Sequence, residues 1–410
     1  MSFFPRIRHG RIELPVVHVR GGTSTGAILH ISHLPSDPAL RAEVLCRLMG
    51  AGPGAEATRQ SSGLGRGYPT SNKVLLVAKA DGDGADVETT LAQLAADKSE
   101  IDWRVTCGNL TAALPLFALD QGLVKAGDPE TSLRIWNTNT AGRIHAVVRT
   151  PGGVPSVPAD TEIPGVTGRF PGVELNWLEP GGQKTGALLP TGRPVDVLKD
   201  LTELETEELN VSCVDAAVPM VVVKAADLDK TARESPDELD EDPQLQARLR
   251  EIRVQAGAAM GLRNPDGTPM SSEQLAQSET MPKICMIAPG DDSCHLHVRY
   301  FTPQKAHRSL AVSGGSCLAA AVLIPGTLAH EMSVEAPRLR SREDDYDVLL
   351  GHPVGILQAK VRAQLRFGVA EIHSVGYTRS AQILMRGYVP LYDASDDLLQ
   401  AFEALTATRT

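Results

Sequence analysis

Residues 106–111 read TCGNLT, and an almost wholly apolar segment follows at residues 112–123. Residues 312–316 read VSGGS and precede a second apolar segment at residues 317–324. A helix that is apolar on every side must be surrounded by other structure. The two stretches therefore predict a weak internal repeat, in which each half of the chain wraps a β-sheet around its own central helix. Pro115 lies inside the first segment and predicts a kinked or shortened helix there.

The segments around these two helices predict strands and amphipathic helices. Asp37 and Pro38 predict the start of a helix that ends at Gly50. Asp242 and Pro243 predict the start of a longer amphipathic helix. The fold class that we expect is therefore α+β. Strands are expected at residues 14–19, 74–78, 133–136, 144–149, 218–224, 285–288 and 295–301, where apolar and β-branched residues gather.

The bulk properties exclude several classes of protein. The chain has 410 residues, which is more than one core usually holds, so two domains are expected. A net charge of −10 and an aromatic content of 4% argue against nucleic acid as a partner, because that role needs a basic surface and stacking rings. No apolar run approaches the roughly 20 residues that span a bilayer, and no secretory signal is visible. We therefore expect a cytoplasmic protein that does not bind a membrane.

The six cysteines are scattered along the chain and include no CxxC pair. This pattern is typical of reduced thiols in a cytosolic enzyme rather than of a disulfide framework. Cys317 is expected one turn into the second predicted helix and therefore in the core. Cys294, His295 and His297 invite a metal interpretation, because the two histidines would share one face of a strand. A zinc site needs three or four convergent ligands, and no nearby acid or cysteine completes the set at a familiar spacing, so no metal is expected.

Two residues are candidates for proton transfer, Cys107 and Lys73. Cys107 stands beside a glycine at the predicted start of a buried helix, where backbone N–H groups attract a carboxylate. Lys73 comes directly before the predicted strand at residues 74–78. Taken alone, a buried cysteine is usually a small apolar residue, and a lysine in this position is usually a solvated flank. Two glycines after Arg20 indicate that the backbone there comes close to another group.

Taken in order, the motifs of this chain resemble those of the PrpF family of methylaconitate isomerases, which includes 4-oxalomesaconate tautomerases and aconitate and methylitaconate isomerases. The resemblance covers most of the chain. No single motif is decisive, but the ordered set is specific. The motifs are RGGTS at residues 20–24, SNK at 71–73, DW at 102–103, CGNLT at 107–111, PTG at 190–192, PK at 282–283, Arg299 with His307, IPG at 324–326, GHP at 351–353 and RSA at 379–381.

This resemblance implies a fold and an activity. The fold is that of diaminopimelate epimerase, with two pseudo-symmetric domains at residues 1–187 (joined by 380–410) and 188–379, and a site in the cleft between them. The activity is that of a cofactor-independent isomerase, which moves a proton across the allylic system of an unsaturated di- or tricarboxylate such as aconitate, methylaconitate or oxalomesaconate. The expected partner is this small molecule, and a homodimer is left open.

The resemblance also assigns roles to residues. Lys73 is implied as the catalytic base with Cys107 beside it, and which of the two is the base stays open. A lysine acts as a base only in its neutral form, and the negative charge that develops on the substrate needs donors already in place. Substrate binding is expected at Arg20, Gly21, Gly22, Thr23, Ser24, Arg66, Ser71, Gly108, Asn109, Leu110, His307 and Ser313.

Three departures from the family pattern leave the substrate open. The family's RGGTSKG has Thr25 in place of its lysine, and its NCGN begins here with Thr106. Its DGMGG loop reads SGLGR at residues 62–66, which loses an acid and gains Arg66. Because arginine binds carboxylates in bidentate fashion, Arg66 hints at an additional or differently placed carboxylate on the substrate.

Two alternatives to the allylic isomerase stay in view. An amino-acid racemase on the same fold needs a second thiol on the opposite face of the reacting carbon. The matching position here is Val312 or Ser313, which argues against that alternative. The other alternative is a non-catalytic accessory partner of an aconitase-like dehydratase.

Overall fold

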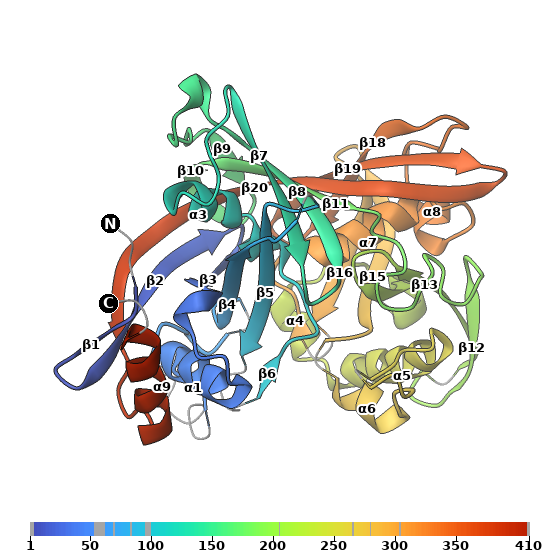
Figure 1. Ribbon diagram of the computed structural model, residues 1–410. Helices are drawn as coiled ribbons and strands as arrows, with labels where there is room; N and C mark the ends of the chain where they lie inside the picture. Colours follow the sequence, from blue (N-terminus) through green and yellow to red (C-terminus); the bar gives the residue numbers. More distant parts are fainter. Residues whose placement is uncertain are drawn as a thin grey trace. The chain divides into compact units, whose positions relative to one another are not determined.

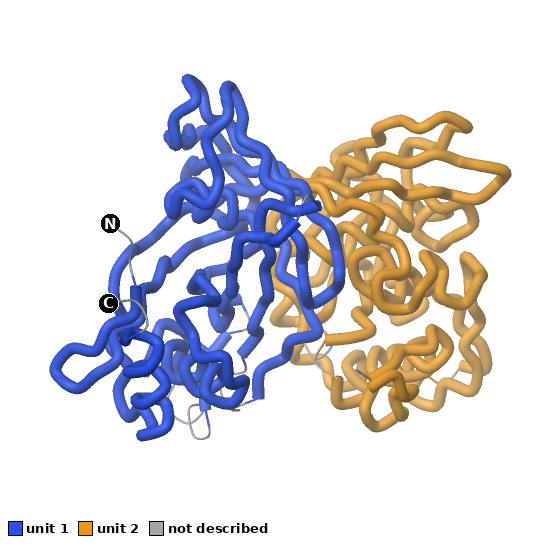
Figure 2. Tube along the Cα trace, in the orientation of Figure 1, with its two compact units in different colours: residues 1–175, 379–410 blue, residues 176–378 orange. Residues whose placement is uncertain are grey.

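The computed structural model describes residues 4–52, 62–68, 70–82, 84–94, 100–204, 206–264, 266–278, 280–302 and 305–407. The chain forms two compact units, residues 1–175 with 379–410 and residues 176–378 (Figure 2). Strands β11 (Gly172–Leu178) and β20 (Val369–Pro390) each run from one unit into the other. None of the helices in these residues is long and apolar enough to cross a membrane.

The first unit combines a sheet with helices on both of its faces (Figure 1). Its other elements are β1 (Arg6–Arg8), β2 (Arg11–Gly21), β3 (Ser24–His30), η1 (Ile31–His33), α1 (Pro38–Met49), β4 (Lys73–Lys79), β5 (Val87–Leu94), β6 (Ile101–Asp102), α2 (Gly108–Thr111), α3 (Leu114–Asp120), β7 (Glu130–Asn137), β8 (Gly142–Arg149), η3 (Pro151–Gly153), β9 (Thr161–Ile163), β10 (Val166–Phe170) and α9 (Asp396–Ala407).

The strands of the first unit alternate between antiparallel and parallel pairing. β2 and β3 are antiparallel, β3 and β4 parallel, β4 and β5 antiparallel, β5 and β7 parallel, and β7 and β8 antiparallel. Helices α1 and α9 pack together on one face of this sheet, where Leu45 and Phe402 belong to one apolar cluster with Val74. The helix predicted from Asp37 to Gly50 is confirmed as α1, since Asp37 caps its start and Gly50 adopts a left-handed φ of 68° at its end.

The second unit contains the long predicted helix and a second sheet. Asp242 caps α5 at the residue expected from the sequence. The elements are β12 (Asp196–Leu201), β13 (Thr206–Asp215), β14 (Pro219–Lys224), η4 (Ala225–Leu228), α4 (Pro236–Asp240), α5 (Pro243–Ala259), α6 (Ser272–Gln277), β15 (Lys283–Asp291), β16 (Cys294–Thr302), β17 (Lys305–Ala306), α7 (Val312–Leu323), α8 (Leu328–Met332), β18 (Asp344–His352) and β19 (Gly355–Arg366).

The second unit repeats the pairing order of the first. β13 and β14 are antiparallel, β14 and β15 parallel, β15 and β16 antiparallel, β16 and β18 parallel, and β18 and β19 antiparallel. In each unit a buried helical segment precedes the last two strands of the series, α2 with α3 in the first and α7 in the second. The chain therefore folds into a mixed α/β protein whose two halves share one order of strand pairing.

The two buried helices differ as Pro115 predicts. The first apolar segment divides into α2 and α3, and Pro115 lies in the first turn of α3, where its missing N–H costs no helical hydrogen bond. The second segment forms the continuous helix α7, in which every residue except Ser313 is buried. Cys317 is fully buried in α7, and its S–H donates to the Val214 carbonyl at 3.4 Å, which confirms its predicted place in the core.

Candidate active site

The candidate site lies on one face of the first unit's sheet. Ala27 and Val74 pack with α1 and α9 in one cluster, so their neighbours Gly26 and Lys73 point to the opposite face. Helix α2 packs on this opposite face. A Cβ added to Gly26 would lie 2.5 Å from the Lys73 carbonyl oxygen and 2.9 Å from the Leu110 side chain. The Lys73 backbone and the Leu110 side chain of α2 are therefore both close to Gly26, and the Lys73 side chain points to the face that α2 covers.

Cys107 caps the N-terminus of α2, as its predicted place at a helix start requires. Its backbone is extended, with φ −130° and ψ 95°, and its sulfur accepts the Leu110 N–H at 3.5 Å. Its S–H donates to the Ser24 Oγ at 3.8 Å, across to the end of β3. Because Ser24 and Gly26 lie two residues apart on one strand, they share the face to which Lys73 points. The thiol and the amine are thus presented to the same side of the sheet.

Lys73 is buried at the first position of β4 and contacts a neutral acceptor. Its Nζ donates to the Oε1 of Gln93, which stands directly opposite on β5. The Gln93 Nε2 donates in turn to the Asn72 carbonyl at 3.1 Å and to the Leu94 carbonyl at 3.4 Å. Both partners of the amide nitrogen are carbonyl oxygens, so the carbonyl end of the amide must face the lysine.

The glycine pair of the RGGTS motif packs against the start of α2. A Cβ on Gly21 would lie 2.2 Å from the Asn109 carbonyl oxygen, and one on Gly22 would lie 2.1 Å from the Asn109 Oδ1. Asn109 donates its Nδ2 to the Thr23 Oγ1 at 3.1 Å and accepts from the Arg379 Nε at 3.2 Å. The close approach predicted for this turn is confirmed, and the group that it approaches is α2.

Several backbone amides that were expected to bind substrate have partners within the protein. The Gly22 N–H donates to the Ser380 carbonyl at 2.9 Å, and the Leu110 N–H donates to the sulfur of Cys107. Gly108 and Asn109 belong to the first turn of α2, where a helix supplies no acceptor for the amide. Their two N–H groups are therefore the donors at this turn that are best suited to an anionic ligand.

Arg20 contacts the scaffold of the turn. Its Nε donates to the Gln382 Oε1 at 2.9 Å, and its Nη1 donates to the carbonyls of Gly22 and Ser380 at 2.9 and 3.0 Å. The guanidinium also lies over the Phe170 ring at 4.4 Å, and burial lowers the pKa of Arg20. Among the described residues, Nη2 is buried without a hydrogen-bond partner. These contacts join β20 to the turn, and a carboxylate-binding role for Arg20 stays a prediction.

The glycine-rich loop that carries Arg66 packs against α1, away from the thiol. Its residues 61 and 69 lie outside the described part of the chain. The Asn72 Oδ1 accepts the Arg66 and Gly67 N–H groups at 2.9 and 3.1 Å, and the Gly65 N–H donates to the Met49 carbonyl of α1. Helix α1 packs on one face of the sheet, and Lys73 and Cys107 lie on the other. The described contacts do not bring Arg66 to the face of Cys107.

Two further observations concern this loop. After burial, the charge of Arg66 is the second cause that lowers the pKa of His18, so the guanidinium acts on a strand residue that shares the face of Ala27. Ser71 is buried, and its Oγ donates to the Tyr68 carbonyl at 3.3 Å, within the same loop. The substrate-binding roles of Arg66 and Ser71 stay predictions.

His307 and Ser313 belong to the second unit. The His307 Nδ1 accepts the Ser309 N–H at 3.0 Å, and its ring meets the Tyr300 ring edge-on at 5.9 Å. Ser313 is the second residue of α7. The N-cap of α7 is Ala311, one residue before the Val312 or Ser313 that the sequence matched to Cys107, and none of these three residues carries a thiol. The substrate contacts of His307 and Ser313 stay predictions.

Asp291, Cys294 and His297 come together at the β15–β16 hairpin, with potential ligand atoms within 4.8 Å of one another. The spacing of the sequence missed Asp291, which the tight turn brings back to the histidine. The His297 Nε2 contacts the Asp291 Oδ2 at 2.8 Å, while the Cys294 sulfur lies 3.8 and 3.7 Å from the two ring nitrogens. The Cys294 sulfur is almost equally far from both ring nitrogens, so it does not lie along the direction in which Nε2 contacts Asp291. This geometry describes a hydrogen-bonded cluster, and the expected absence of a metal stays a prediction.

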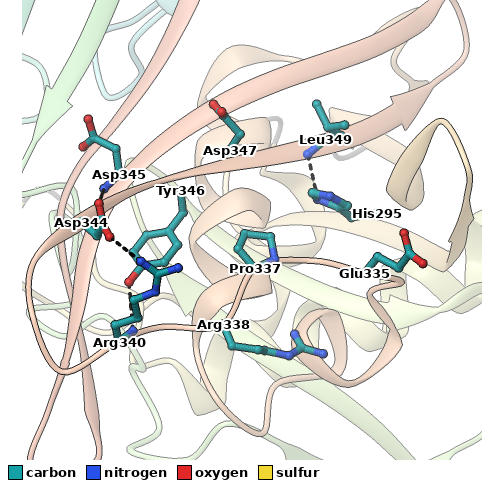
Figure 3. Close-up of a pocket in the computed structure, with 10 residues that line it drawn as sticks. All are labelled: His295, Glu335, Pro337, Arg338, Arg340, Asp344, Asp345, Tyr346, Asp347 and Leu349. Atoms are coloured by element: carbon teal, nitrogen blue, oxygen red, sulfur yellow. Dashed lines mark hydrogen bonds and ion pairs between the residues drawn. The ribbon is translucent and has the colours of Figure 1, made fainter.

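A pocket of about 570 Å³ opens in the second unit (Figure 3). Four carboxylates and two guanidinium groups line it, which makes its wall acidic and ill-suited to a polycarboxylate. Arg340 is paired with Asp344 at 3.0 Å, and the His295 Nδ1 accepts the Leu349 N–H at 3.1 Å. None of the site residues predicted from the sequence lines this pocket, so we assign no function to it.

Sequence reasoning missed Gln93 and the role of Arg379 beside Asn109. A signal for Gln93 was available, because it shares one face of β5 with the apolar residues Val87 and Leu91, which are buried. Arg379 belongs to the RSA motif at residues 379–381, but that motif gave no signal for the contact with Asn109. Arg379 lies 270 residues from Asn109 in sequence, and only the return of β20 brings the two together.

Comparison with solved structures defines the class of fold. The structure is similar to that of a methylitaconate-delta-isomerase, with a TM-score of 0.76, 29% identity and coverage of 95% of this chain and 97% of that chain. It is also similar in fold to a hydroxyproline epimerase from Agrobacterium vitis, with a TM-score of 0.53, 15% identity and coverage of 97% and 95% of the two chains. The protein therefore has the mixed α/β fold that these isomerases and epimerases share.

The family follows from the sequence comparison. The PrpF protein family matches residues 11–392, and the chain belongs to this family. A (4E)-oxalomesaconate Delta-isomerase from Novosphingobium is 32% identical over 385 residues, which cover 94% of this chain and 99% of that protein. The resemblance drawn from the ordered motifs is confirmed.

Proposed function

We propose that this protein is a cofactor-independent isomerase, which moves a proton between two carbons of an unsaturated di- or tricarboxylate. The observation that carries the proposal is that the Lys73 side chain and the Cys107-capped helix α2 lie on the same face of the sheet. Support also comes from the family, whose members include the oxalomesaconate and methylitaconate isomerases named above. Aconitate, methylaconitate and oxalomesaconate form the candidate set of substrates.

The proposed reaction is a 1,3-proton shift. The neutral amine of Lys73 takes a proton from an allylic carbon, so a C–H bond breaks and an N–H bond forms. The electron pair moves into a dienolate, whose negative charge spreads onto carboxylate oxygens. A proton is then returned to the carbon two positions away, from Lys73 itself or from the Cys107 thiol. In the second case the Lys73 ammonium gives its proton to the Cys107 thiolate through solvent, which restores both groups. The double bond has moved, and atoms and charge balance without a cofactor.

The dienolate needs donors that are in place before the charge develops. The Gly108 and Asn109 amides are proposed for this role, since both lie in the first turn of α2 next to Cys107. The contacts of Asn109 with Thr23 and Arg379 hold that turn in one position. A preorganised pair of amides favours the charged intermediate over the neutral substrate.

The test is turnover in deuterated water. The purified protein, incubated with cis-aconitate, methylaconitate or oxalomesaconate, should release an isomer that carries deuterium at the allylic carbon, detected by proton NMR and mass spectrometry. Lys73→Ala should slow this exchange by about 10³-fold, because general base catalysis typically contributes 10²–10⁴-fold. Absence of exchange with all three compounds would contradict the proposed function.

A matched control separates loss of the base from loss of the fold. Lys79 lies at the exposed end of the same strand, so Lys79→Ala removes an amine from β4 without touching the site. This variant should keep wild-type turnover, and both variants should keep wild-type circular dichroism. Equal activity of the Lys73→Ala and Lys79→Ala variants would remove Lys73 from the mechanism.

The amino-acid racemase is the less favoured candidate. Racemisation by two bases needs a second thiol, and none of Ala311, Val312 and Ser313 at the start of α7 carries one. Incubation with proline, hydroxyproline and diaminopimelate in deuterated water tests it, and exchange at Cα of any of them would favour it.

The finer organisation is part of the proposal: a cytoplasmic protein with domains at residues 1–187 plus 380–410 and 188–379, each with its sheet wrapped around a central helix.

A further inference from the structure

The amide of Gln93 is fixed on three sides. Its Nε2 donates to the Asn72 and Leu94 carbonyls at 3.1 and 3.4 Å, and its Oε1 accepts from the Lys73 Nζ. Asn72 precedes Lys73 in the chain, so the amide is anchored to the same backbone that carries the lysine. A side chain with three such contacts has little freedom to rotate, and this fixes the position of its oxygen.

The orientation of this amide follows from chemistry. A carbonyl oxygen only accepts hydrogen bonds, and an ammonium group only donates them. A flipped Gln93 would place its oxygen against the Asn72 and Leu94 carbonyls, so both of these contacts would be lost whatever the charge of Lys73. Only one orientation satisfies all three partners.

We propose that Gln93 is a positioning residue for Lys73, which holds the amine at the inner face of the sheet through a neutral acceptor. This inference rests on the proposed function, in which Lys73 moves the proton. The oxygen of Gln93 fixes the position of Nζ on the side of Cys107 and Ser24. Correct placement of a reacting group removes a large entropic part of the barrier.

The second part of the proposal is that the side chain in contact with Lys73 must be an uncharged amide. A carboxylate at this position would favour the charged ammonium form and withhold the neutral amine that a base requires. Lys73, Gln93 and Asp102 lie side by side on the neighbouring strands β4, β5 and β6, because Gln93 pairs with Lys73 on one side and with Asp102 on the other. Its two carboxylate oxygens accept from the Arg104 Nε and Nη2 at 3.0 and 3.2 Å. The Asp102 carboxylate is therefore paired with Arg104, and the group in contact with Lys73 is the Gln93 amide.

The first experiment replaces Gln93 with glutamate. Gln93→Glu should move the low-pH limb of the kcat/KM profile upward by about one unit or more, because an adjacent opposite charge shifts a titration by that amount. Below that limb the rate should fall by about tenfold for each unit of the shift. KM should stay within about threefold, because the proposal gives this amide a contact with Lys73 and none with the substrate. Gln400→Glu is the matched control, since Gln400 is exposed on α9, a helix that packs on the other face of the sheet.

A second variant is needed in case the Gln93→Glu protein misfolds, because a carboxylate at position 93 would face two carbonyl oxygens. Gln93→Met keeps the length of the side chain and removes the acceptor. It should lower kcat by about ten- to a hundredfold, because the amine loses its fixed position, with KM little changed and the pH limb not displaced upward. A purely structural role for Gln93 would lower the melting temperature and leave the pH profile and kcat of the folded fraction unchanged.

The outcomes separate this inference from the proposed function. Wild-type protein that turns over no substrate, or a Lys73→Ala variant of wild-type activity, contradicts the function itself. Turnover that depends on Lys73, together with a Gln93→Met variant whose kcat and pH profile match those of Gln400→Glu, overturns the role of Gln93 alone. If Gln93→Glu does not fold, Gln93→Met decides the question.

Discussion

Cys107 caps α2 and is proposed to transfer a proton, and a single substitution can separate the two functions. Its sulfur caps α2 by accepting the Leu110 N–H, and its S–H points to Ser24. Capping needs only an acceptor, which a hydroxyl supplies at least as well. Proton transfer to carbon needs the acidity of a thiol, which a hydroxyl lacks.

We therefore expect Cys107→Ser to keep the fold and lose the activity. The serine variant should match the wild-type free energy of unfolding within about 0.5 kcal/mol, whereas Cys107→Ala should lose about 1 kcal/mol with the cap. If the thiol returns the proton, both variants should lose about 10²-fold or more in kcat. Urea titration and the deuterium exchange assay measure the two effects. A serine variant with wild-type kcat would assign Cys107 to the cap and leave both proton transfers to Lys73.

At the scale of elements, the turn between β2 and β3 depends on glycine. A Cβ on Gly21 would enter the space of the Asn109 carbonyl and the Leu110 Cα, which are backbone atoms that cannot move aside alone. Gly387 is also a strand glycine of this unit, and a Cβ there would meet nothing within 4 Å. The two positions form a matched pair on neighbouring strands.

Gly21→Ala should displace α2 and with it Cys107. We expect a loss of about 1–3 kcal/mol in the free energy of unfolding, as for other overpacked sites, and a larger loss of activity than of stability. Gly387→Ala should change both by little. Urea unfolding and the exchange assay decide the matter. A Gly21→Ala variant as stable and active as Gly387→Ala would show that the close approach is not required.

Local patterns predicted most of the elements, while contacts between distant segments escaped prediction. Asp37 and Gly50 bound α1, and Pro115 separates α3 from α2, because caps and prolines act within one turn of a helix. The lysine and the thiol could be named from ordered motifs. The contact of Arg379 with Asn109 depends on a strand that returns after 270 residues, and no local pattern encodes such a pairing.

At the scale of the whole molecule, the two units share a pairing order and differ in chemistry. The turn that carries Gly21 and Gly22 in the first unit corresponds in strand order to the turn after Asp215 in the second. Gly22 and Ala217 adopt similar left-handed φ values of 52° and 65°. Asp215 is a fully buried carboxylate, whereas Gly21 has no side chain. The second unit therefore carries a titratable group where the first has only backbone.

The buried carboxylate of Asp215 should make the stability of the protein depend on pH. Burial raises the pKa of Asp215, against the opposing effect of hydrogen bonds from the N–H groups of Lys184 and Thr185 and from the Thr185 hydroxyl. Its Oδ1 is buried without a partner among the described residues. The folded state therefore holds this proton more tightly than the unfolded chain does. Between the pKa of the unfolded chain, about 3.9, and the raised folded value, this group makes the free energy of unfolding fall as pH rises.

Asp215→Asn removes this titration and keeps an oxygen that can accept from all three donors. The free energy of unfolding of the variant, minus that of the wild type, should therefore increase as pH rises from about 4 through the folded pKa of Asp215 and then level off. Urea titrations at intervals of half a pH unit measure this difference. Asp81→Asn, at an exposed carboxylate, controls for the change in net charge. A difference that stays flat or falls with pH would mean that Asp215 is ionised in the folded state at no cost, through the three donors that face its Oδ2.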